Sequence, residues 1–198
     1  MKKLNVPNTL SLIRVALVPV FVLSLILMRD IKIWGCVIPA FIYILTGLTD
    51  MLDGKIARKY NLVTDFGKFI DPLADKFMVI GSQIAILVWM MLTSADYTLP
   101  LVFVWVVLII LFRELGVTSL RLVVAGKSGI VVAASMLGKL KTVSQMVGTV
   151  VILIEPALPF FSENHILSYV FMAVMAFTTL FSGYDYLKAY MPYIDSNK

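Results

Sequence analysis

The chain has 198 residues, of which 60% are hydrophobic and only 15% are charged, and its mean hydropathy is +0.94. Soluble domains carry about 25% charged residues, so this composition excludes an ordinary soluble protein and indicates an integral membrane protein. The net charge of +5 does not indicate nucleic-acid binding, because nucleic-acid-binding proteins carry their basic surface on a soluble domain.

Six apolar runs are long enough to form a transmembrane helix, which needs about 20 residues. They are too long for barrel strands, and lipid tolerates only helices or closed barrels. We therefore expect an all-α integral membrane protein that forms a single domain over residues 1–198. The expected spans cover residues 10–28, 33–52, 70–93, 99–124, 130–154 and 166–189.

Most lysine and arginine residues fall on one side of this six-span arrangement, the side of both termini. The opposite side carries only the basic residues Arg29 and Lys32. Because such a bias marks the cytoplasmic side of a membrane protein, we expect both termini to be cytoplasmic. The basic side is then suited to anionic lipid headgroups or to a phosphorylated substrate.

An acidic segment, DMLDGKIARKYNLVTDFGKFIDPLADK, separates the second and third expected spans. Asp50 and Asp53 are three residues apart, and Asp71 and Asp75 are four apart, so each pair lies on one face of a helix. The link between the pairs is short, and the two helices are therefore expected to be antiparallel neighbours. That arrangement would gather four carboxylates at the cytoplasmic membrane boundary.

Four carboxylates in one small site raise one another's pKa values, and divalent cations relieve this repulsion. Ligands that are all oxygen favour Mg²⁺, Mn²⁺ or Ca²⁺ over zinc, and the single His and single Cys lie elsewhere in the chain. Two cations bridged by carboxylates are an arrangement that clamps phosphoryl groups. The alternative is a solvated loop of scattered charges, which does not account for aspartates at helix spacing on both flanks.

The residues between the aspartates suit a phosphate ligand. Gly54 and Gly67 have no side chain, so a ligand can approach the backbone closely there. Ala57, one turn after Asp53, has a small side chain that leaves space for the ligand on the same helix. Arg58 can form a fork with phosphate oxygens. The segment therefore predicts a metal and phosphate site.

The pattern D-x-x-D-G-x-x-A-R, then eight residues, then G-x-x-x-D-x-x-x-D resembles the signature of the CDP-alcohol phosphotransferase family. All eight signature positions match, and the resemblance covers essentially the whole chain. It implies six transmembrane helices, usually as a homodimer. It also implies a bacterial-type cytoplasmic (inner) membrane and an active site that faces the cytoplasm.

The resemblance also implies a reaction, in which an acceptor alcohol attacks the β-phosphate of CDP-diacylglycerol and CMP leaves. Two cations, Mg²⁺ or Mn²⁺, would be held by Asp50, Asp53 and Asp71 and by Asp50, Asp71 and Asp75. Asp75 would also be the general base for the acceptor hydroxyl. The residues implied for binding CDP-diacylglycerol are Asn8, Arg14, Gly54, Ala57, Arg58, Thr64 and Gly67. Asn8 is also a candidate cap for the first span.

Further motifs resemble the branch of the family whose acceptor is glycerol 3-phosphate. They are NVPNTLSLIRVALVPV at residues 5–20, FRELGVTSLR at 112–121 and GKLKT at 138–142. A phosphorylated acceptor needs cations beyond the metal site, and an ionisable residue in apolar sequence is functional by default. The candidates are Arg113, Arg121, Lys139 and Lys141, with Glu114 to orient an arginine. The alternative for these cations is positive-inside anchoring by snorkelling side chains.

Other functions stay open at this point. A sister enzyme would use inositol phosphate, serine or phosphatidylglycerol as acceptor, although the basic residues disfavour serine. A divalent-cation transporter would need acids near the membrane midplane and a polar route across it, and the outer halves of the expected spans hold few ionisable groups. A non-catalytic membrane scaffold would tolerate loss of the Asp75 carboxylate.

Overall fold

The computed structural model of the chain is all-helical, with no strand among the residues that it describes. These residues are 5–31, 33–60, 64–94, 96–128, 136–161 and 164–193, and the side chains at 51, 53–55, 57–59, 68, 127 and 128 lie outside the description. The long helices are α1 (Val6–Leu27), α2 (Trp34–Tyr60), α3 (Asp65–Thr93), α4 (Thr98–Ser128), α5 (Met136–Ile154) and α6 (Ile166–Tyr190). Two short 3₁₀ turns, Glu155–Ala157 and Met191–Tyr193, follow α5 and α6.

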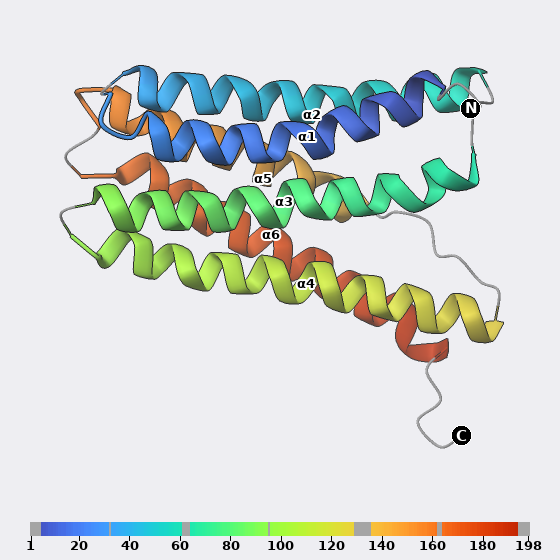
Figure 1. The fold of residues 1–198 in the computed structure, drawn as a ribbon. Helices are drawn as coiled ribbons and strands as arrows, with labels where there is room; N and C mark the ends of the chain where they lie inside the picture. Colours follow the sequence, from blue (N-terminus) through green and yellow to red (C-terminus); the bar gives the residue numbers. More distant parts are fainter. Residues whose placement is uncertain are drawn as a thin grey trace.

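The six helices form one elongated bundle (Figure 1). Helix α1 packs against α2 and α3, α6 packs against α4 and α5, and further contacts join α2 to α5 and α3 to α4. Helix α1 begins at the same end of the bundle at which α6 ends, as Figure 1 shows. We call this end the site end.

The expectation that α2 and α3 are adjacent neighbours is wrong for the described residues. Helix α1 packs extensively against both of them, whereas α2 and α3 share almost no direct contact. Figure 1 shows α1 between α2 and α3 along most of their length. The two aspartate pairs can therefore meet only with α1 side chains between or beside them.

Five helices are long and apolar enough to cross a membrane: α1, α3, most of α4, α5 and α6. The second expected span, residues 33–52, is also helical as α2, but its apolar part, Trp34–Asp50, is shorter. The chain thus has the features of a multi-pass membrane protein. Helix α3 begins at Asp65 and α2 continues to Tyr60, so both extend further into the acidic segment than the expected spans. Residues 130–135 of the fifth expected span lie outside the described residues.

The helix starts have local causes. Asn5, not Asn8, caps α1, because its side chain accepts a hydrogen bond from the Asn8 backbone N–H. Thr64 caps α3 by accepting from the Gly67 N–H at 3.0 Å. Before α4, Asp96 accepts from the hydroxyl and the N–H of Thr98, and these hydrogen bonds hold the pKa of Asp96 below its ordinary value.

The core lies between the helices and is filled by large apolar side chains such as Phe21, Ile86, Phe103 and Met175, each 2% exposed or less. The outside of the bundle is also apolar. Trp105, Phe112 and Phe177 are each more than 60% exposed, a distribution that suits a lipid surround.

Candidate active site

Two of the predicted metal-binding aspartates, Asp50 and Asp75, meet at one arginine of α1. Arg14 is fully buried, and its Nη1 lies 2.8 Å from Oδ1 of Asp50 on α2 and 3.2 Å from Oδ1 of Asp75 on α3. One nitrogen thus contacts one aspartate from each of the two predicted pairs. The Asp50 and Asp75 side chains stay 42% and 58% exposed, so a ligand can reach them.

The third aspartate, Asp71, is also held from α1. The hydroxyl of Ser11 donates to Asp71 Oδ1 at 2.5 Å, and Ser11 itself is fully buried. Ser11 lies one turn before Arg14, so both side chains project from the same face of α1. We name Asp50, Asp71 and Asp75, with Ser11 and Arg14, the aspartate site.

The predicted nucleotide-binding residues Asn8, Thr64 and Gly67 form one contiguous group beside the aspartate site. The Asn8 amide and the Thr64 hydroxyl are hydrogen-bonded, with Nδ2 to Oγ1 at 3.0 Å. A Cβ atom added to Gly67 would lie 2.9 Å from Asn8 Oδ1 and 3.8 Å from Asp71 Oδ2. Gly67 is therefore the point at which the first turn of α3 approaches α1 most closely.

Four further predicted residues, Asp53, Gly54, Ala57 and Arg58, lie on the last turns of α2. Their backbone is helical, so Asp53 follows Asp50 by about one turn, but their side chains are outside the described residues. Their contribution to the site therefore stays a prediction.

A second polar cluster joins α4, α5 and α6. Oε1 of Glu114 accepts from Arg113 Nη1 at 3.1 Å and also from the Lys141 ammonium group. Arg113 Nη2 donates to the Ser182 hydroxyl at 2.9 Å. The side chains of Arg113, Glu114 and Lys141 are 12% exposed or less, so these charges are held inside the bundle. We name Arg113, Glu114 and Lys141 the cationic cluster, because two cations face one carboxylate.

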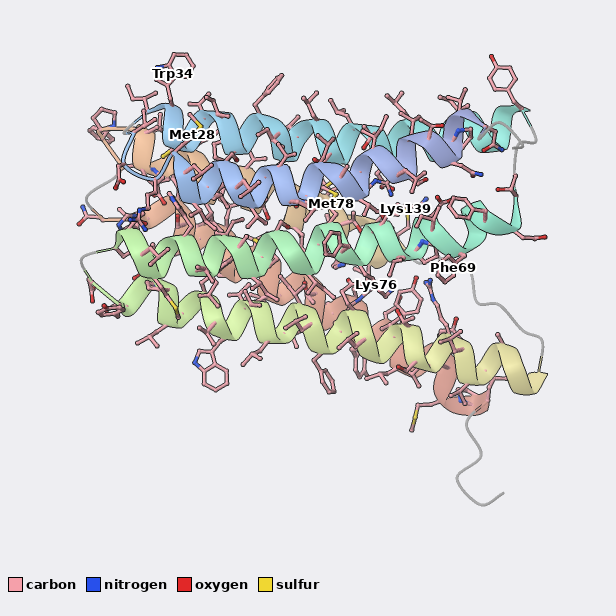
Figure 2. All side chains as sticks on the ribbon, in the orientation of Figure 1. Met28, Trp34, Phe69, Lys76, Met78 and Lys139 are labelled. Carbon is pink, nitrogen blue, oxygen red and sulfur yellow. The ribbon has the colours of Figure 1, made fainter. Side chains whose placement is uncertain are left out.

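Helix α3, which carries Asp75 and Lys76, packs against α4, which carries Arg113 and Glu114. Figure 2 shows Lys76 on the side of α3 that faces α4. Successive residues of an α-helix are rotated by about 100° around its axis. Asp75 can therefore face α1 while Lys76 faces α4.

The two remaining predicted cations differ in their surroundings. Arg121, two turns beyond Arg113, donates from Nη2 to the Tyr186 hydroxyl at 2.6 Å. Lys139 is exposed on the second turn of α5 and is labelled in Figure 2. The structure thus groups Arg113 and Lys141 closely and leaves Lys139 on the surface.

Sequence reasoning missed three residues of this region: Ser11, Ser182 and Tyr186. The position of Ser11 three residues before Arg14 was a usable signal, because it places the hydroxyl on the same helix face. Ser182 and Tyr186 carry no such signal. They reach α4 only through the packing of α6 against α4.

Comparison with known proteins decides the family. The model of the CDP-alcohol phosphatidyltransferase family matches residues 4–182. The chain belongs to the CDP-alcohol phosphatidyltransferase family.

Curated members of the family match almost the whole chain. A Bacillus subtilis protein is 41% identical over 194 residues, which cover 92% of this chain and 93% of that protein. A Yersinia enterocolitica protein is 34% identical, covering 94% of this chain and 95% of its own length. A Rickettsia bellii protein is 33% identical, covering 96% and 97%. All three carry the name CDP-diacylglycerol–glycerol-3-phosphate 3-phosphatidyltransferase.

Family members generally depend on divalent metal ions, and the aspartate site has the chemistry for them. Asp50 and Asp75 share one arginine, and Asp71 is held by Ser11 of the same helix, so the site carries more negative than positive charge and offers oxygen ligands. Among the described side chains no three are grouped tightly enough to hold one ion, and the fourth aspartate, Asp53, is not among them.

Proposed function

We propose that this protein transfers the phosphatidyl group of CDP-diacylglycerol to glycerol 3-phosphate, giving phosphatidylglycerophosphate and CMP. The observation that carries the proposal is the meeting of Asp50 and Asp75 on Arg14, in a bundle that also holds a buried cluster with surplus positive charge. The names of the relatives, which match more than 90% of the chain, support the same reaction.

The aspartates would act as metal ligands. Asp50, Asp53, Asp71 and Asp75 would hold two divalent cations, Mg²⁺ or Mn²⁺, and these would neutralise the diphosphate and acidify a nearby hydroxyl. Ser11 and Arg14 orient the carboxylates from the buried side, since their hydrogen bonds fix one oxygen of each described aspartate. The Asp50 and Asp75 side chains stay 42% and 58% exposed, so a metal ion can reach them.

Asp75 is the candidate general base. Its exposed carboxylate would accept the proton of the acceptor hydroxyl, whose oxygen forms the new bond to the β-phosphorus. The bond from that phosphorus to the bridging oxygen breaks, and CMP leaves with the electron pair. The bond from Arg14 Nη1 holds Asp75 Oδ1 in place, and the side chain of Asp75 is 58% exposed, so an acceptor can reach it.

The two substrates would bind on opposite sides of the aspartate site. Asn8, Thr64 and Gly67, with Gly54, Ala57 and Arg58, would hold the cytidine diphosphate. Arg113 and Lys141, with Arg121 and Lys139, would bind the phosphate of the acceptor. Glu114 neutralises one of the two buried cations, so the cationic cluster keeps a net positive charge for a phosphate dianion.

We further propose the family arrangement in the membrane: six transmembrane helices, both termini and the active site on the cytoplasmic side of the inner membrane, and a homodimer. The positive-inside bias supports the orientation, and the start of α1 and the end of α6 at one end of the bundle agree with it.

The test is a product assay. The purified protein is incubated with CDP-diacylglycerol, Mg²⁺ or Mn²⁺ and, in separate reactions, glycerol 3-phosphate, inositol phosphate, serine or phosphatidylglycerol. CMP release and the lipid formed are both measured. Of the four acceptors, we expect only glycerol 3-phosphate to give a lipid product, phosphatidylglycerophosphate. If glycerol 3-phosphate caused no release of CMP, the proposal would be refuted.

A further inference from the structure

Tyr186 of α6 lies between the two arginines of α4 that are candidates for the acceptor phosphate. The Cζ atoms of Arg113 and Arg121 lie 5.3 Å and 4.8 Å from the centre of its ring. Both distances are within the range of cation–π attraction. Eight residues separate the arginines, or slightly more than two turns, so both can reach one ring from the same side of α4.

The ring itself is held firmly. Tyr186 is only 3% exposed and stacks on Tyr190, with ring centres 6.2 Å apart, and it packs with Val117 and Val124 of α4. A buried aromatic side chain with two rotatable bonds is a rigid support for a long, flexible arginine. Among the described residues, the contacts that hold this ring come from α4 and α6, and the aspartate site is built from α1, α2 and α3.

The contacts of the two arginines differ in a way that matters for an anion. Arg113 shares Glu114 with Lys141, so part of its charge is compensated. Arg121 donates to the neutral Tyr186 hydroxyl, and among the described side chains it forms no ion pair. Tyr186 thus fixes the direction of Arg121 without cancelling its charge, which is what binding of a phosphate dianion requires.

We propose that Tyr186 is a positioning residue of the acceptor site, which holds the guanidinium groups of Arg113 and Arg121 in the orientation that binds the phosphate of the acceptor alcohol. This inference rests on the proposed function. It extends that function by a residue that touches neither the aspartate site nor the nucleotide-binding group among the described contacts.

The experiment measures KM for glycerol 3-phosphate, KM for CDP-diacylglycerol and kcat of purified variants. We expect Tyr186→Phe, which loses only the hydroxyl, to raise KM for glycerol 3-phosphate about 3-fold, and Tyr186→Leu, which also loses the ring, to raise it at least about 10-fold. KM for CDP-diacylglycerol should stay within about 2-fold of wild type. Tyr190→Phe is the matched control, because it removes a hydroxyl from the same pair of rings, and it should behave as wild type.

A double-mutant cycle separates positioning from a general structural role. If Tyr186 acts through Arg121, the change Tyr186→Phe should have no further effect on KM once Arg121→Gln is present. Additive effects, or equal rises in both KM values, would overturn the inference. Tyr186→Phe is close to isosteric and keeps the test decisive even if Tyr186→Leu fails to fold. Absence of activity with glycerol 3-phosphate in the wild type would instead refute the proposed function, so the two failures are distinguishable.

Discussion

Gly67 and Asn8 are packed so closely that a Cβ atom on Gly67 would lie 2.9 Å from Asn8 Oδ1. Real Cβ atoms do not approach a neighbour this closely, so a larger residue at position 67 must displace the Asn8 amide. Asn8 is only 6% exposed and is hydrogen-bonded to Thr64, so it has little freedom to move aside. The contact ties the start of α3 to α1 next to Asp71.

We therefore predict that Gly67→Ala lowers kcat/KM for CDP-diacylglycerol by at least about 10-fold, because the nucleotide-binding group and Asp71 shift together. Steady-state kinetics with both substrates measures the effect. Gly116→Ala is the matched control, because it also adds a methyl group to a helix but meets no atom within 4 Å. Its activity should be unchanged, and equal losses in the two variants would contradict the steric explanation.

Arg14→Lys tests whether the planar guanidinium group of Arg14, rather than its charge alone, organises the aspartate site. A lysine keeps the positive charge but lacks the rigid plane that fixes the position of Nη1 between Asp50 and Asp75. We expect CMP release to fall by about 10²-fold with the fold retained. Arg29→Lys, at a half-exposed arginine beyond the far end of α1, is the control. A wild-type rate for Arg14→Lys would show that charge alone suffices.

Asp75→Asn tests the assignment of the general base. The amide keeps the size of the side chain and can still accept from Arg14, but it cannot take up the acceptor proton. We predict a loss of turnover of about 10³-fold or more, with an unchanged helical circular-dichroism spectrum and thermal midpoint within a few degrees. Asp65→Asn changes an exposed acid in the first turn of the same helix and should retain activity. Unchanged turnover in Asp75→Asn would rule out the base.

Glu114→Gln removes the carboxylate shared by Arg113 and Lys141. Two largely buried cations then lose their counter-charge. Removal of one partner of a buried ion pair typically lowers the free energy of unfolding by about 3 kcal/mol, so we expect a clearly lower thermal midpoint. KM for glycerol 3-phosphate should rise as well, because Lys141 is no longer held. Thermal unfolding and kinetics are both measured. Asp30→Asn, which breaks the exposed pair with Arg29, should change neither.

The sequence predicted the helices well, because their signals are local. Apolar length placed each helix, and the spacing of Asp50 with Asp53 and of Asp71 with Asp75 placed their carboxylates on helix faces. The helix boundaries were less accurate. Residues 53–60 and 65–69, which include several charged residues, continue the helices α2 and α3, whereas the expected spans ended at residue 52 and began at residue 70.

The sequence could not predict which helices are neighbours. Lipid-facing and core-facing surfaces are both apolar here, as the exposed Phe112 and the buried Phe103 of α4 illustrate, so hydrophobicity does not identify the packed face. The short link between α2 and α3 led us to expect that they are adjacent, whereas α1 packs against both.

The sequence by itself determined the membrane class, the helices, the family and the set of acidic residues, because each follows from composition or from spacing along one segment. Only the tertiary structure decided what surrounds those acids. Arg14 reaches Asp75 across 61 positions of the chain, and Arg121 reaches Tyr186 across 65. Such contacts depend on how whole helices pack, and no local pattern encodes that packing.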